Sequence, residues 1–222
     1  MRALLVGLIA LALCVGSAAA QTLEITPYTL HGYAPGRQFE VTRAVSTPTG
    51  FETRGYLGYQ QSSTGLGARF GVWPLRRLGL ELSLATRSGL RSVLQRIPND
   101  ATWYGQGWKA TVTETGLRVA VRPVNRPGGR LQFAAGVTRL TFGGIAYYEA
   151  VDETPLVHRT VTGGSFGANW MTRVSGRLMA SVGIDDIVYR VTPTTWPGDT
   201  TRRWTQHDIA LSTAFVVRVS GP

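Results

Sequence analysis

The 222-residue sequence predicts an all-β fold, an eight-stranded antiparallel up-and-down transmembrane β-barrel. Two observations lead to this prediction: segments with an apolar residue at every second position, and connections between them that are alternately long and short. The segment 78–87 is the clearest, because leucine fills four alternate positions, Leu78, Leu80, Leu82 and Leu84. Side chains alternate between the two faces of a strand, so these leucines form an apolar face and Glu81 lies on the other.

Eight alternating segments are present, and we expect strands over 21–32, 66–73, 78–87, 111–122, 130–142, 161–172, 177–191 and 204–219. Long connections follow the first, third, fifth and seventh segments, and short ones follow the second, fourth and sixth. All long loops then lie at one end of the barrel, as in membrane barrels. The segment 33–65 is expected to be the longest loop, and the alternative is that 51–59 extends the flanking strands beyond the sheet. Asp185 and Asp186 interrupt the seventh segment, and we expect a β-bulge there.

The first 20 residues have the three regions of a secretory signal peptide. Arg2 precedes an apolar run over 3–15, and small residues follow up to Ala20. We expect cleavage after Ala20, which leaves one domain over 21–222. The run is shorter than the roughly 20 apolar residues that a membrane-spanning helix needs. Cys14 lies inside it, so the mature chain has no cysteine for a disulfide.

The chain is strongly basic, with a formal net charge of +10. The distribution of this charge argues against a nucleic-acid partner, because the arginines are dispersed over strands, turns and loops and Lys109 is the only lysine. For an exported protein, phosphates of a membrane surface, such as those of lipopolysaccharide, are the better candidates. The loop cations that could contact them are Arg37, Arg43, Arg54, Arg91, Arg96 and Lys109.

The polar face of the strands predicts a charged barrel interior. Eight strands enclose a space that side chains just fill, so we expect buried ion pairs instead of an open pore. A selective narrow pathway is the alternative. The expected lumen network is Arg69, Glu81, Glu114, Arg118, Arg122, Asp208 and Arg218, in which the first four residues can pair with one another. Arg87, Gln132 and Asn169 are also expected to face inward.

The apolar face of the strands is expected to contact lipid. A soluble barrel that binds an apolar ligand would need the reverse arrangement, with an apolar interior and a polar exterior. The expected lipid-facing residues are Leu78, Leu80, Leu82, Leu84, Leu117, Val119, Leu211 and Phe215. Aromatic residues near strand ends fit two interfacial girdles: Trp73 and Trp170 at the short turns, and Trp108, Phe142, Tyr189 and Trp204 at the loops.

Catalytic and metal-binding patterns are weak. His207 and Asp208 with Ser212, and the pair Asp185–Asp186, could supply catalytic groups. However, adjacent residues of a strand point to opposite faces. The three histidines are far apart in sequence, and the mature chain lacks cysteine ligands. We therefore expect no enzyme activity, no metal and no cofactor.

With its signal peptide, its alternating strands such as 78–87 and its last strand over 209–219, the sequence resembles the small eight-stranded outer-membrane barrels, the class of the OmpA transmembrane domain, OmpX and OmpW. The resemblance covers essentially the whole mature chain and lies in pattern, without a signature motif. One departure is the C-terminus, which reads Val219-Ser220-Gly221-Pro222, whereas the class usually ends on an aromatic residue.

The resemblance implies a monomer in the bacterial outer membrane, surrounded by outer-membrane lipids and inserted by the barrel-assembly machinery. A structural or surface-interaction role through the extracellular loops is then expected. A narrow channel or small-molecule transporter is one alternative, and a soluble exported ligand-binding barrel is another.

Overall fold

The computed structural model describes residues 22–96, 103–126, 128–144, 159–191 and 204–220, so the predicted signal peptide lies outside the described residues. The strands are β1 (Thr22–Thr47), β2 (Gly50–Leu75), β3 (Leu78–Arg96), β4 (Trp103–Arg126), β5 (Gly129–Gly144), β6 (Arg159–Ser175), β7 (Leu178–Val191) and β8 (Trp204–Ser220). Each strand pairs antiparallel with the next, and β8 pairs with β1. The predicted closed, up-and-down eight-stranded barrel is confirmed. In the described segments, no helix is long and apolar enough to cross a membrane.

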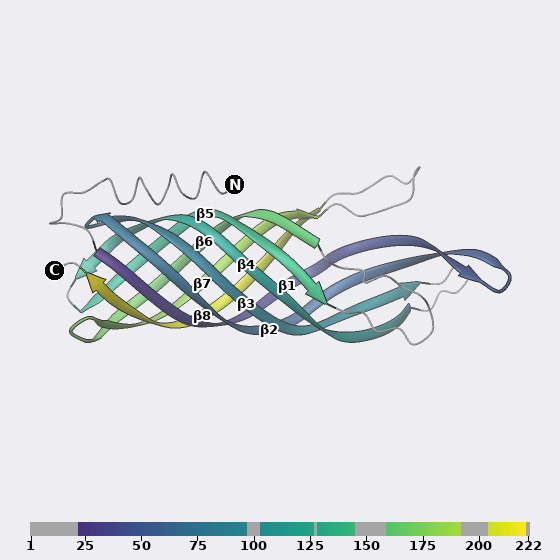
Figure 1. The fold of residues 1–222 in the computed structure, drawn as a ribbon, viewed down its shortest axis with the longest axis horizontal. Helices are drawn as coiled ribbons and strands as arrows, with labels where there is room; N and C mark the ends of the chain where they lie inside the picture. Colours follow the sequence, from purple (N-terminus) through teal and green to yellow (C-terminus); the bar gives the residue numbers. More distant parts are fainter. Residues whose placement is uncertain (1–21, 97–102, 127, 145–158, 192–203, 221–222) are drawn as a thin grey trace.

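The two ends of the barrel differ as the connection lengths predict. The β2–β3 turn is Arg76–Arg77 and the β6–β7 turn is Gly176–Arg177, and both lie at the same end as the start of β1 and the end of β8 (Figure 1). We call this the turn end. The opposite end, where β1 turns into β2, is the loop end.

The segment 33–65, expected to be a loop, instead forms the extended arms of a hairpin. β1 and β2 stay paired up to Thr47 and Gly50, and Gly50 has a positive φ of 135° in the turn that joins them. The expectation was wrong because Pro35 and Gly36 do not end the strand. Register shifts between Gly32 and Phe39 accommodate them, and pairing resumes beyond.

Four of the strands project beyond the closed barrel. The last β1–β8 pair is Tyr33 with Ile209, and the last β4–β5 pair is Ala110 with Gly144. Beyond these pairs, β1 to β4 continue as one paired sheet, which we call the extension, formed by 34–47, 50–62, 90–96 and 103–109. Figure 1 shows the extension leaving the loop end, with the β1–β2 hairpin reaching furthest.

The wall of the barrel alternates as the sequence predicts, with apolar side chains on the outside. All eight expected lipid-facing positions lie on this outer face, and Phe215 and Leu211 are more than half exposed, at 56% and 58%. The exposed large apolar residues of the wall are Leu23, Ile25, Leu66, Phe70, Leu78, Leu84, Leu117, Val119, Val121, Phe133, Val137, Phe166, Trp170, Val182, Ile184, Leu211, Phe215, Val217 and Val219.

β7 contains no bulge at the two aspartates. Its register with β6 and with β8 runs without a shift through Asp185 and Asp186, so the expected bulge is wrong. Simple alternation therefore continues to the end of the strand. Asp185 points into the lumen, Asp186 points outward, and Ile187 and Tyr189 are buried inside the barrel.

Candidate functional site in the filled lumen

Asp185 is the centre of an ion-pair layer that crosses the lumen. One of its carboxylate oxygens accepts a hydrogen bond from Arg69 of β2 and the other accepts one from Arg118 of β4. Arg69 also donates to Asn169 Oδ1 at 3.0 Å, and Arg118 Nη2 lies 3.3 Å from Glu81 Oε2. The layer joins β2, β3, β4, β6 and β7 through buried charges, and each guanidinium has a carboxylate partner.

A second set of contacts connects this layer to the turn end. Gln132 donates to Glu81 Oε1 at 2.7 Å and accepts a hydrogen bond from Arg122 Nε at 3.1 Å. Arg122 then forms a two-point contact with Glu24 of β1, and Arg130 Nη1 lies 3.1 Å from the same carboxylate. Gln132 is 1% exposed, so its amide depends on protein partners for hydrogen bonds.

Arg87 holds a third set of contacts, towards the loop end. It donates to Asp208 and, at 3.1 Å, to Ser63 Oγ. Its Nε lies 2.7 Å from Glu114 Oε1, an ion pair by distance, although the N–H is not aligned for a hydrogen bond. Arg87 and Asp208 are only 2% and 1% exposed, so both charges depend on protein partners.

Three of the expected girdle residues lie inside the barrel. Trp73 is buried, and the guanidinium carbon of Arg122 lies 3.3 Å from the centre of its ring, a cation–π contact. Tyr189 is also buried, 6.1 Å from Phe142 between ring centres. The girdle prediction is therefore wrong for Trp73, Tyr189 and Phe142. The two-residue alternation along the strand could have excluded Trp73 from the girdle, because it places Trp73 on the same inward face as Arg69.

The other girdle candidates differ. Trp170 is exposed on the outer wall and its indole N–H donates to Thr172 Oγ1 at 3.1 Å, so it has the position expected of an interfacial aromatic residue. Trp204 is half-buried at an inward position, two residues before the buried Gln206. The side chain of Trp108 lies outside the described part of the structure.

The lumen network is assembled differently from the sequence hypothesis. Glu81 meets Arg118 as expected, but Glu114 pairs with Arg87, and Arg69 pairs with Asp185. Arg218 is half-buried at the turn end.

Three charged network members were missed: Glu24, Arg130 and Asp185. The two-residue alternation was sufficient to place Glu24 inside, because it alternates with the outward-facing Leu23 and Ile25. It also pointed to Arg130, but the expected bulge hid Asp185.

The expected catalytic groups do not converge. His207 points outward and its Nδ1 lies 2.8 Å from Asp186 Oδ2, whereas Asp208 and Ser212 are buried on the inward face of the same strand. Asp185 is occupied by two arginines. Among the described residues, no group of three or more histidine, cysteine, aspartate or glutamate side chains could hold a metal ion.

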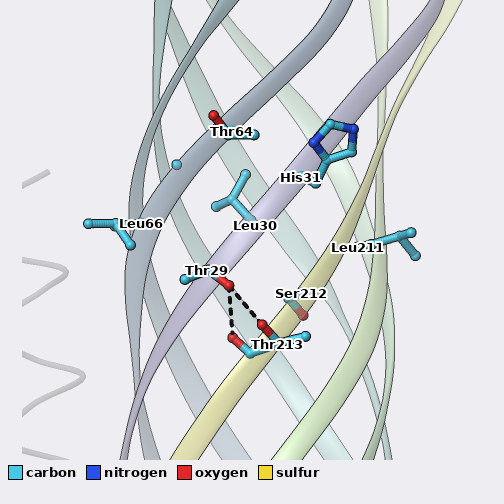
Figure 2. A pocket seen from close by; sticks show the side chains of 9 residues that line it. Thr29, Leu30, His31, Thr64, Leu66, Leu211, Ser212 and Thr213 are labelled. Atoms are coloured by element: carbon cyan, nitrogen blue, oxygen red, sulfur yellow. Dashed lines mark hydrogen bonds between the residues drawn. The ribbon is translucent and has the colours of Figure 1, made fainter.

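The outer wall also carries an open depression where β1 meets β2 and β8. Figure 2 shows Thr29 and Thr213 on neighbouring strands, joined by a 2.8 Å hydroxyl contact, with Leu66 and Leu211 on either side and His31 nearer the loop end. The depression has a volume of about 520 Å³. Its hydroxyls interrupt the apolar wall, but their hydrogen-bonding capacity is partly met within the wall.

No family model and no curated protein matches the sequence. The outer membrane protein OprG from Pseudomonas aeruginosa has a similar structure, with a TM-score of 0.56 and 13% sequence identity over 93% of this chain and 99% of that chain. The chain has the fold of OprG. The outer membrane protein AlkL (TM-score 0.49, 11% identity, 93% of this chain and 95% of that chain) and the N-terminal β-barrel domain of Pseudomonas aeruginosa OprF (0.42, 12%, 88% and 96%) also match, at lower TM-scores.

Proposed function

We propose that the protein is an outer-membrane β-barrel with a closed lumen, which acts by presenting the extension to an anionic surface outside the cell. It performs no catalysis and needs no cofactor. The observation that carries this proposal is the combination of a lumen filled by paired charges with four strands that continue beyond the barrel.

The membrane location is supported by the distribution of polarity across the wall. Apolar side chains cover the outside, while buried charges with partners fill the inside, which is the reverse of a soluble barrel that binds an apolar ligand. Closure of the sheet leaves the wall without unpaired strand edges, as lipid requires. In this orientation the turn end is periplasmic and the loop end is extracellular.

Export, assembly and oligomeric state belong to the same proposal. The segment 1–20 is removed as a signal peptide, the barrel-assembly machinery inserts the mature domain 21–222, and the barrel stays monomeric among outer-membrane lipids. Extraction of outer membranes with detergent tests this: the folded protein should migrate differently on a gel before and after heating. Recovery only in the soluble periplasmic fraction, without a mobility shift, would contradict the membrane location.

The closed lumen predicts that the purified protein gives no reproducible single-channel current in a planar bilayer. A null result needs a positive control from the same chain. Replacing Arg69, Arg118, Asp185 and Glu81 together by alanine removes the two positive and two negative charges of the central ion-pair layer, so no charge of that group is left isolated. We expect this quadruple variant to conduct ions. Reproducible currents from the unaltered protein would favour the narrow-channel alternative.

The extension carries an excess of cationic residues. It contains Arg37, Arg43, Arg54, Arg91, Arg96 and Lys109 against two carboxylates, Glu40 and Glu52. The backbone register places Arg43 of β1 directly opposite Arg54 of β2. Like charges at directly opposed positions destabilise a strand pair unless an anion offsets them. This juxtaposition supports phosphates of lipopolysaccharide as the partner.

Charge reversal at this pair tests the surface role. The double variant Arg43→Glu and Arg54→Glu should bind lipopolysaccharide-containing vesicles at least tenfold more weakly than the unaltered protein. The binding that remains should depend less on salt, because fewer cationic side chains take part. Arg76→Glu with Arg77→Glu makes the same charge change in the β2–β3 turn, and should leave binding unchanged. Equal losses of vesicle binding in both variants would mean that binding depends only on the net charge of the protein and not on this arginine pair.

A further inference from the structure

Arginines gather at the turn end of the barrel around one carboxylate. Five arginines come from β4, β5, β6, the β6–β7 turn and β8, and the carboxylate comes from β1. We call this set the turn-end cluster: Glu24, Arg122, Arg130, Arg173, Arg177 and Arg218.

The charge at this position is not balanced by the cluster itself. Glu24 is already shared by Arg122 and Arg130, so both of its oxygens are engaged. The central layer differs, because there two arginines, Arg69 and Arg118, meet the two carboxylates of Asp185 and Glu81. The Arg87 set has two carboxylates for one arginine. Relative to carboxylates, arginines are therefore most numerous at this end of the described lumen.

A small pocket lies within the turn-end cluster. It is lined by Glu24 and four of the arginines, with Met179 and Val216 as its apolar lining. Its enclosed space is about 10 Å³, roughly enough for one water molecule. Arg173 and Arg177 are exposed at its mouth, and their long side chains can close over a larger ligand there.

Arg130 supplies an independent sign of a missing partner. Its side chain is 10% exposed, and its Nη1 reaches Glu24 at 3.1 Å. Among the described residues, four arginines have a buried Nε without a hydrogen-bond partner, Arg69, Arg87, Arg118 and Arg130, and of these Arg130 is the one that lines this pocket. A buried guanidinium N–H without an acceptor is costly, and an oxyanion at the pocket can satisfy it.

We propose that the turn-end cluster binds a phosphate group presented from the periplasmic side. Several guanidinium forks around one pocket suit a multi-oxygen anion better than a halide, because each fork can donate two parallel hydrogen bonds to two oxygens. The phosphate can be free inorganic phosphate, or the phosphodiester of an anionic phospholipid in the inner leaflet, whose charge no cation of the same headgroup offsets. The inference uses the membrane orientation given above, but it does not depend on what the extension binds.

The test compares two sources of phosphate on the full mature chain folded in detergent. The first probe is inorganic phosphate against sodium chloride at equal ionic strength, with thermal unfolding and calorimetric titration as readouts. The second is nanodiscs of phosphatidylcholine with and without phosphatidylglycerol. We expect a saturable stabilisation in at least one arm. Saturable stabilisation by inorganic phosphate identifies the free ion as the ligand. Stabilisation by phosphatidylglycerol alone identifies the lipid headgroup as the ligand.

The diagnostic variant is Arg173→Gln with Arg177→Gln, which removes two exposed charges and leaves the buried contacts intact. It should weaken phosphate binding at least tenfold. Arg76→Gln with Arg77→Gln removes the same charge from the β2–β3 turn, four strands away around the closed barrel, and should bind normally. Absence of saturable binding in both arms would overturn the proposal. Equal effects of chloride and phosphate, or equal losses in both variants, would also overturn it, because they indicate screening without a site.

Discussion

Leu82→Arg should lower the free energy of unfolding of the inserted barrel by about 2 to 4 kcal/mol, the cost of an arginine on the lipid face near the bilayer midplane. Leu82 lies midway along the wall portion of β3. It pairs with Phe70 on one side and Leu117 on the other, and both neighbours are exposed on the outer face. A guanidinium there has no carboxylate within the apolar wall. Urea titration of the protein in lipid vesicles measures the loss.

The matched control is Leu75→Arg. Leu75 is exposed at the end of β2, beside the Arg76–Arg77 turn, where a guanidinium can reach water and headgroups. The same substitution should therefore cost about 0 to 1 kcal/mol. Equal stability of both variants would mean that β3 faces the other way, or that the wall does not contact lipid.

Asp185→Leu should destabilise the barrel by about 3 to 5 kcal/mol, because it leaves two buried guanidinium groups without their shared partner. Arg69 and Arg118 are 5% and 4% exposed, so water cannot replace the lost carboxylate without opening the lumen. Glu81 still reaches Arg118, but it does not contact Arg69 in the described network. Denaturant unfolding in vesicles or detergent gives the value.

The adjacent Asp186→Leu makes the same chemical change on the other face of β7. Asp186 is partly exposed on the outer wall and pairs only with the half-exposed His207 among the described residues. Its loss should change stability by no more than about 1 kcal/mol. If Asp186→Leu is strongly destabilising and Asp185→Leu is not, β7 contains the bulge that the register excludes.

Alternation along each strand was enough to predict the barrel, its eight strands and the two faces of its wall. Leu82, Leu117 and Phe215 could be placed outside because the two-residue period is a local property of an extended chain. The ends of the strands were less predictable. Pro35 and Gly36 normally end a strand, but pairing on both sides of a register shift carries β1 through them.

The partners inside the lumen could not be predicted in the same way. The two-residue alternation shows that Arg69, Glu114 and Arg118 face inward. It does not show which oppositely charged residue each one contacts, because that depends on the stagger of strands far apart in sequence. Trp73 shows the same limit, since its contact with Arg122 exists only after the barrel closes. The sequence by itself determined the fold and the faces of the wall, because both follow from local alternation. The tertiary structure alone decided the ion-pair partners, the extension and the turn-end cluster, because these depend on register between strands.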